Sequence, residues 1–132
     1  MSGTQQERPP AGSVAASISN AVVRLLAEYT GRGPTKARTY INDDYIAVVL
    51  QDTLTRGERS LARDGREELV LSNRKAYQQT MSSDLIATVE QITGRTVLAF
   101  LSDNHMEPDI AVESFVLVPL DGERSEPATG SG

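Results

Sequence analysis

Residues 44–51, with the sequence DYIAVVLQ, constrain the fold more than any other segment of this chain. The run is rich in β-branched and apolar residues, which favours a β-strand. Successive side chains of a strand point to opposite faces, and here both sets contain apolar side chains. The two sets are Ile46, Val48 and Leu50, and Tyr45, Ala47 and Val49. Each face therefore has to be covered, either by helices on opposite faces of the sheet or by a second copy of the chain. We expect a homodimer.

Two β-hairpins are predicted. The first joins residues 36–41 to residues 44–51 through Asn42 and Asp43, whose side chains tolerate left-handed turn geometry. The second lies near the C-terminal end of the chain. Its strands are residues 95–103 and 110–119, joined by a polar loop over residues 104–109. Because a hairpin pairs its strands antiparallel, the four strands predict an antiparallel sheet.

The first predicted helix covers residues 13–30, where apolar side chains recur every three or four positions, as one face of a helix requires. These side chains are Val14, Ile18, Val22, Leu25, Leu26 and Tyr29. Gly31 is placed to end the helix as a left-handed C-cap, and Pro34 prevents the helix from resuming.

Two more helices are predicted between the hairpins. Thr55 and Glu58 have the spacing of a capping box and start a short helix that ends near Arg63. Residues 64–67, Asp-Gly-Arg-Glu, offer a second cap for a long helix that ends at Gly94. The stripe that we expect this helix to bury is Val70, Tyr77, Met81, Leu85, Val89 and Ile92.

The order α-β-β-α-α-β-β predicts an α+β fold, in which two main helices and one short helix pack on a four-stranded antiparallel sheet made of two β-hairpins. A length of 132 residues suits a single domain, which we place at residues 13–119. Residues 1–12 and 120–132 are rich in Gly, Pro, Ser and charged residues. They contain almost nothing to bury, so we expect them to be disordered tails.

Charge and composition exclude several classes of function. Eighteen acidic residues against thirteen basic ones give a net charge of -5, which repels phosphate backbones, so nucleic acid is not an expected partner. The absence of cysteine excludes thiolate zinc sites and favours a reducing, cytoplasmic compartment. No apolar run approaches the roughly 20 residues that cross a bilayer, so we expect no transmembrane segment.

The segment Gly-Arg-Gly-Pro-Thr-Lys at residues 31–36 is the candidate binding site. Its glycines free the backbone to approach an anion, and the nearby cations could neutralise that anion. We therefore predict an anion-binding or partner-binding site at Arg32, Gly33, Lys36 and Arg38. The segment is not a Walker A loop, because Thr35 precedes Lys36 and no helix start follows. The alternative is a helix stop and strand entry whose cations are solvated.

Metal binding and catalysis have weaker support. His105 lies near Asp103 and Asp109, but the spacing matches no EF-hand and Pro108 interrupts any helical arrangement of ligands, so we expect a solvated loop and no metal. The fold could bring together the carboxylates of Asp43, Asp44 and Glu113. No nucleophile, base or metal set has a recognisable spacing, however, so we expect neither an enzyme nor a cofactor.

A cluster of charged residues follows the first hairpin. Its four arginines alternate with acidic residues, so that the local charge nearly cancels. They are Arg56, Arg59, Arg63 and Arg66. We expect them to form a solvated, salt-bridged face.

Several of these features together resemble the MpsC-type domain, a bacterial family long described as a domain of unknown function. The similarity extends from the first helix to Val118. The residues that carry it are Gly31-Arg32-Gly33-Pro34, Leu54-Thr55 with Glu58 and Leu61, Arg74, Thr93-Gly94 with Val97, and the hairpin from Ser102-Asp103 to Phe115. The resemblance implies association with a sodium-translocating, membrane-potential-generating system whose membrane subunits are tied to inorganic carbon uptake. It implies no catalytic residues.

Two functional hypotheses follow. The first is an accessory or regulatory interaction domain that docks on the cytoplasmic face of membrane transporter subunits and is peripheral to that membrane. Its contact residues would be Arg32, Lys36 and Arg38. The second is a sensor domain for a small anion or metabolite, in which the same turn holds a carboxylate, phosphate or bicarbonate.

Overall fold

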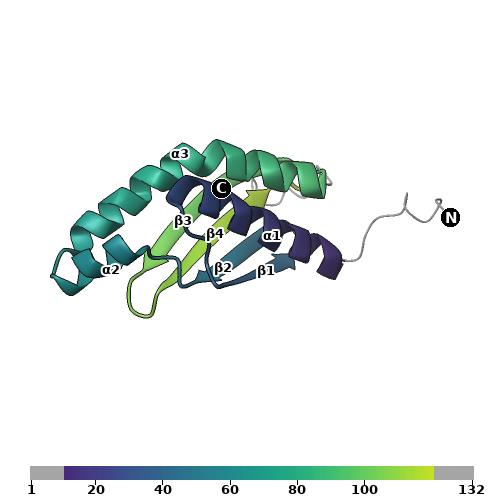
Figure 1. Cartoon of the computed structure of the whole chain (residues 1–132). Coiled ribbons are helices and arrows are strands. Elements are labelled where there is room, and N and C mark those ends of the chain that lie inside the picture. Colours follow the sequence, from purple (N-terminus) through teal and green to yellow (C-terminus); the bar gives the residue numbers. More distant parts are fainter. Residues whose placement is uncertain (1–10, 121–132) are drawn as a thin grey trace.

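The computed structural model describes residues 11–120 of the chain. It has three helices and four strands in the predicted order α-β-β-α-α-β-β, which confirms the α+β fold (Figure 1). The helices are α1 (Ala11–Thr30), α2 (Arg56–Arg63) and α3 (Glu67–Thr93). The strands are β1 (Lys36–Asn42), β2 (Tyr45–Gln51), β3 (Val97–His105) and β4 (Ile110–Leu117).

The four strands form one sheet in the order β1-β2-β4-β3, and every neighbouring pair is antiparallel. Both hairpins are therefore confirmed, and they meet through their second strands, β2 and β4. The edges of the sheet are β1 and β3. This order was not predicted, because pairing between the two hairpins depends on contacts between residues far apart in the sequence.

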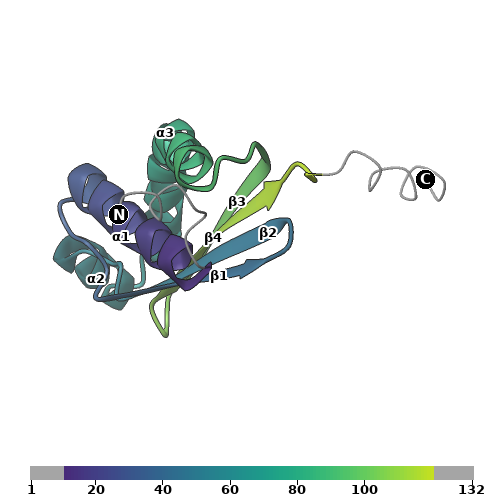
Figure 2. The same cartoon turned by 90° about the vertical axis from the view of Figure 1, so that its right-hand side faces the viewer.

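The helices α1 and α3 lie side by side on the same face of the sheet (Figures 1 and 2). Alternate residues of β2 and β4 pack against them in one core. That core consists of Ile18, Val22, Leu26, Ile46, Val48, Leu50, Met81, Leu85, Val89, Ala111, Phe115 and Leu117. The alternative with helices on opposite faces is therefore wrong. Each main helix is joined by a short link to the hairpin that follows it, and it packs against that hairpin. Because the two hairpins are neighbours in one sheet, the two helices lie side by side on the same face.

Most of the predicted local signals are present. Thr55 and Glu58 form the capping box of α2, and Gly31 and Gly94 have left-handed backbones at the ends of α1 and α3. Asp43 also has a positive φ in the β1–β2 turn. The predicted side-chain cap at residues 64–67 is wrong. There the amides of Gly65 and Arg66 bond back to Ala62 O and Leu61 O in a Schellman motif that closes α2.

Several bounds differ from the predicted ones. Helix α1 begins at Ala11, so it includes the last two residues of the predicted N-terminal tail. The rest of the two predicted tails, residues 1–10 and 121–132, lies outside the described residues. Strand β3 begins at Val97, two residues later than predicted. Just before it, the Arg95 side chain binds Asp44 Oδ1 (2.6 Å) and Val118 O (3.0 Å) at that end of the sheet.

One predicted core residue is exposed. Tyr77 lies outside the buried stripe of α3, whereas two polar residues, Arg74 and Gln78, lie within it. The buried face of α3 passes through residues 70, 74, 78, 81, 85 and 89, at steps of three and four positions. Arg74 and Gln78 occupy this face because polar groups, described below, lie beneath the first half of α3. Within residues 11–120, no helix is both long and apolar enough to cross a membrane.

Candidate functional site

The four residues of the predicted binding site fall into two separate environments. Arg32 and Gly33 lie in the link between α1 and β1, next to other loops. Lys36 and Arg38 lie on β1, on the face of the sheet that carries no helix. The structure therefore does not gather the four into one cradle, and the binding role of this segment stays a prediction.

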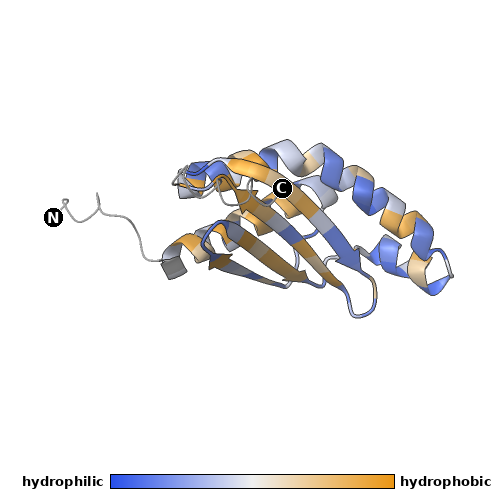
Figure 3. Cartoon of the chain, turned by 180° about the vertical axis from the view of Figure 1, so that it is seen from behind, coloured by the Kyte–Doolittle hydropathy of each residue, from blue (hydrophilic) through white to orange (hydrophobic). Residues whose placement is uncertain are grey.

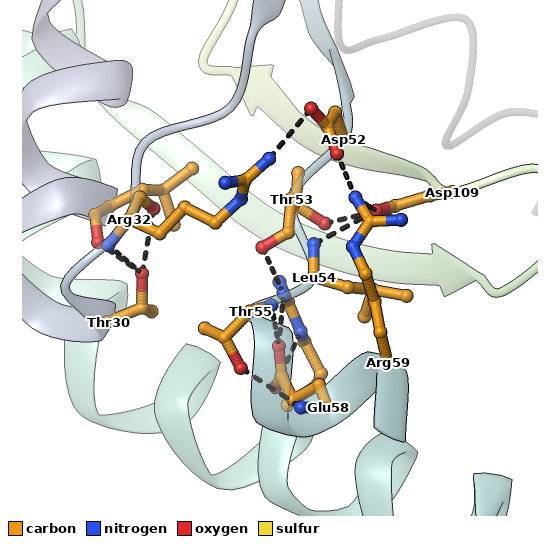
Figure 4. A network of polar contacts seen from close by, with 11 residues as sticks. Thr30, Arg32, Asp52, Thr53, Leu54, Thr55, Glu58, Arg59 and Asp109 are labelled. Atoms are coloured by element: carbon orange, nitrogen blue, oxygen red, sulfur yellow. Dashed lines mark hydrogen bonds and ion pairs between the residues drawn. The ribbon is translucent and has the colours of Figure 1, made fainter. Parts of the chain in front are cut away.

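Arg32 is engaged in an ion-pair network (Figure 4). Its Nη2 atom lies 2.7 Å from Asp52 Oδ2, and the other oxygen of Asp52 contacts Arg59 of α2. Partial burial raises the pKa of Asp52, but the Arg32 and Arg59 guanidinium groups outweigh this effect and hold that pKa below its ordinary value. Arg59, predicted to lie on a solvated, salt-bridged face, is 41% exposed and pairs with Asp52 and Asp109.

Gly33 has a packing role in this structure. A Cβ atom at this position would lie 3.3 Å from Val23 Cγ1 and 3.6 Å from Ala27 Cβ, both on α1. The absence of a side chain thus lets the link pass close to the helix. The close approach of the link to α1 therefore accounts for Gly33, and the left-handed backbone at the end of α1 accounts for Gly31.

The same network joins the β2–α2 link to the start of β4 (Figure 4). Asp109 accepts hydrogen bonds from Thr53 Oγ1 (3.0 Å) and from the amide of Leu54 (2.9 Å), and its Oδ2 atom is 3.5 Å from Arg59 Nη2. Asp109 is one of the acidic residues that lie near His105 in the sequence. Across residues 11–120, no three His, Cys, Asp or Glu side chains are grouped so that they could hold a metal ion.

A buried ion pair anchors this region to α3. Arg74, which is 5% exposed, binds Glu58 Oε1 through Nη2 (2.8 Å) and Glu58 Oε2 through Nε (3.2 Å). Its Nη2 atom also donates to Thr53 O at 2.5 Å. Glu58 in turn accepts from the amide of Thr55 (2.8 Å). One arginine therefore ties the short helix and the end of the first hairpin to the long helix.

A second buried carboxyl lies nearby on β4. Glu113 is 1% exposed, faces the helices, and stands opposite Ser102 of β3 and Val48 of β2 in the sheet register. Burial raises the pKa of Glu113 to about 7, against smaller lowering effects of the Ser102 hydroxyl and the Arg74 guanidinium. Glu113 Oε1 and Ser102 Oγ are both buried and make no hydrogen bond of good geometry, although the two side chains lie close enough for the Ser102 hydroxyl to act on the Glu113 carboxyl. Buried polar atoms without a good hydrogen bond are unusual in proteins, so Glu113 and Ser102 are a polar pair within an otherwise apolar core.

A groove of about 460 Å³ opens beside these atoms, between α3 and the edge strand β3. Ser102 and Gln78 belong to its lining, and Lys75 adds a cation to it. Phe100 and Ile86 provide its apolar surface. Glu113 lies one strand further in, next to Ser102. The groove therefore combines a cation, amides and hydroxyls with apolar walls, as small-molecule sites commonly do.

The three carboxylates that could have formed a catalytic group do not meet. Asp44 lies in the β1–β2 turn and is bonded to Arg95 (2.6 Å). Glu113 is opposite Val48, three residues along β2 from Tyr45, which corresponds to about 10 Å of strand. His105, the only histidine of the chain, lies at the end of β3 away from Asp44, where its Nδ1 atom is 2.9 Å from Pro108 O.

Figure 3 views the sheet from the side away from the helices, and this side is here called the open face. Its side chains are a mixture of apolar and polar residues. It carries the alternate residues of each strand that do not contribute to the core. Three large side chains on it are substantially exposed: Tyr40 (52%), Tyr45 (44%) and Leu101 (58%). A hollow of about 660 Å³ on this face is lined in part by Lys36, Arg38, Tyr40 and Val49.

The register places the side chains of the open face in rows across the sheet. One row consists of Arg38, Val49, Val112 and Asp103, and the next consists of Tyr40, Ala47, Ser114 and Leu101. Arg38 also lies over the Tyr40 ring, with Cζ 5.7 Å from the ring centroid. The sequence showed that both faces of β2 are apolar, but it could not show which residues of the other hairpin share the open face.

Comparisons with known proteins identify a family. Residues 11–118 match the family described as "Na+-translocating membrane potential-generating system (MpsC)". The chain is also similar to the "Uncharacterized protein YrhF" of Bacillus subtilis (strain 168), with 26% identity over 101 residues that cover 75% of this chain and 83% of that protein. No solved structure matches the chain. The family match spans every helix and strand described above and confirms the resemblance noted in the sequence: this chain belongs to the MpsC family.

Proposed function

We propose that this chain is a cytoplasmic accessory domain of a Na⁺-translocating, membrane-potential-generating system, and that it acts by binding protein through its open face. The family description supports the link to such a system. The observation that carries the proposal is the open face itself, where the register places the exposed side chains of Tyr40, Tyr45 and Leu101 on one side of the sheet. Exposed large apolar side chains on one face are a feature of interaction sites.

The chain buries one face of its sheet against α1 and α3 and leaves the other face without a helix. The core face excludes water from the alternate residues of β2 and β4. The open face offers side chains of similar character that gain favourable free energy, about 25 cal/mol per Å² of apolar area, when a partner covers them. A partner that covers this face would therefore need an apolar surface of its own.

Co-purification from the native bacterium tests this proposal. We expect membrane ion-transport subunits to be recovered with the tagged wild-type chain, and Leu101→Asp to reduce their recovery at least tenfold, because a charge on the open face opposes its burial. Leu120→Asp is the matched control, since Leu120 is also exposed but lies beyond the last strand. Equal recovery with Leu101→Asp, or no transport subunit with the wild type, would contradict the proposal.

A second candidate function, a sensor for a small anion or metabolite, is favoured by the groove between α3 and β3. Its support is the Ser102 hydroxyl, which lines a groove that also carries Lys75 and lies next to the buried Glu113 carboxyl. A small carboxylate or bicarbonate could bind the lysine and accept from the serine hydroxyl. In this proposal the ligand site lies at the groove and not at the Gly-Arg-Gly-Pro turn.

Calorimetry with acetate and bicarbonate as probes tests the sensor. We expect salt-sensitive binding that weakens at least tenfold in Lys75→Ala and persists in Arg32→Ala, because Arg32 is engaged by Asp52. The reverse pattern, loss in Arg32→Ala alone, would assign the site to the turn instead. No binding of either probe to the wild-type chain would remove the case for an anion of this class.

A further inference from the structure

We infer that the occupant of the open face is a second copy of this chain, packed face to face about a two-fold axis parallel to the strands, with Arg38 of each copy against Asp103 of the other. This inference rests on the proposal that the open face is a contact surface, and it names the protein that covers that face. In the dimer the open face is buried, so transport subunits would contact the dimer elsewhere, and Leu101→Asp would lower their recovery by separating the two copies.

The two edges of the open face carry opposite charges. Lys36 and Arg38 lie on the edge strand β1, and Asp103 lies on the other edge strand, β3. All three side chains are exposed. Arg38 and Asp103 belong to the same row, because Arg38 pairs with Val49, Val49 with Val112, and Val112 with Asp103. The face thus has a cation and an anion at the same height on opposite edges.

A two-fold axis parallel to the strands turns this arrangement into self-complementarity. When two sheets stack about such an axis, β1 of one copy lies over β3 of the other, and each row keeps its height. Arg38 then faces the partner's Asp103, and the contact occurs twice because a two-fold interface repeats every pair. An axis perpendicular to the strands would gather both pairs of cations at one edge and both aspartates at the other, which like-charge repulsion disfavours.

The same operation matches the apolar side chains. In the row that contains Arg38, Val49 faces the partner's Val112. In the next row Tyr40, on β1, faces the partner's Leu101 on β3, while the small residues Ala47 and Ser114 meet at the centre. In this row the large side chains lie at the edges and the small ones at the centre, whereas on the central strands Tyr45 faces the partner's Val116. Two such sheets would stack about 10 Å apart. Across such a gap a long arginine side chain can reach a short aspartate.

This arrangement also explains why both faces of β2 are apolar. Residues Ile46, Val48 and Leu50 pack on the helices of their own chain. Tyr45 and Val49 would pack on the second sheet, so that every face of the central strand is covered. The dimer is then a four-layer body, with helices outside and two sheets inside.

Charge reversal of full-length chains, followed by sedimentation and light scattering, tests the inference. The wild type should have twice the 14.3 kDa chain mass at concentrations on the order of 0.1 mM. Arg38→Asp and Asp103→Arg should each weaken dimerisation at least tenfold, because each creates two like-charge contacts. Arg56→Asp is the matched control: it makes the same change at an exposed position of α2, away from the open face, and should dimerise as the wild type does.

Mixing the two single variants provides the decisive observation. A heterodimer of Arg38→Asp with Asp103→Arg places an aspartate against an arginine at both contacts, so the mixture should dimerise while neither variant does so alone. The double variant Arg38→Asp/Asp103→Arg should also recover the wild-type dimer. A monomeric wild type, undiminished dimers of the single variants, or a mixture that stays monomeric would each overturn the inference.

These outcomes are separate from those of the proposed function. If the purified chain is a monomer while transport subunits still co-purify through Leu101, the open face binds the membrane partner and the homodimer is wrong. If the charge-reversal variants behave as expected but no transport subunit is recovered, the homodimer stands and the accessory role fails.

Discussion

Arg74→Met should lower the free energy of unfolding by about 3 to 5 kcal/mol, as expected when one member of a buried ion pair is removed. Arg74 is 5% exposed and makes two hydrogen bonds to Glu58, which is itself 7% exposed, and one to Thr53 O. Without the guanidinium, a carboxylate and a carbonyl remain buried with fewer partners. Urea unfolding at pH 7, followed by circular dichroism, measures the change.

A second substitution shows whether the loss comes from the unpaired charge. Glu58→Gln keeps the side-chain oxygen that accepts from the Thr55 amide but removes the negative charge. The variant Arg74→Met/Glu58→Gln should therefore be more stable than Arg74→Met alone, by about 1 to 2 kcal/mol. Arg66→Met, at an exposed position just before α3, should change stability by less than about 0.5 kcal/mol. A double variant less stable than Arg74→Met would show that the charge is not the cause.

Glu113→Gln should remove a loss of stability that the wild-type chain undergoes between pH 5 and pH 8. The folded chain holds a proton on Glu113 up to a pKa of about 7, whereas the ordinary value is 4.5. The stabilisation is complete below pH 4.5 and is lost as the pH rises through 7, because the folded state must then hold a buried carboxylate. The shift corresponds to at most about 3 kcal/mol.

The expected result is that Glu113→Gln matches the wild type near pH 5 and exceeds it by about 2 to 3 kcal/mol at pH 8. The charged group that faces Glu113 from the helix layer is Arg74, so the experiment keeps that residue unchanged. The lowered pKa of Asp52 acts in the opposite direction, but only as the pH falls through and below 3.8, outside this window. Glu107→Gln, at an exposed loop position, is the control and should follow the wild-type pH profile. An identical profile for Glu113→Gln would refute the buried-acid account.

The candidate sites illustrate what sequence patterns miss. The capping-box glutamate Glu58 was recognised from its spacing to Thr55, but its second role, holding Arg74 sixteen residues away, has no local signature. One signal was available: Arg74 and Gln78 fall at helical spacing within the apolar stripe of α3, and a polar residue in such a stripe indicates a buried partner. Glu113 likewise alternates with apolar residues of β4 on the core side. Arg74, Gln78 and Glu113 are therefore polar exceptions within apolar stripes, and such exceptions mark the buried polar contacts between α3 and the elements beneath it.

The sequence by itself determined the elements, their order and most of their ends. Periodicity, turn residues and caps act within a few positions, so α1, both hairpins and the capping box of α2 could be inferred without knowing the fold. The tertiary structure decided how the hairpins join, that α1 and α3 share one face, and which side chains share the rows of the open face. These features depend on contacts between residues far apart in the chain, where many arrangements bury similar apolar area. Only the packing of the whole core selects among them, and it is this selection that places Arg38 and Asp103 on opposite edges of one exposed surface.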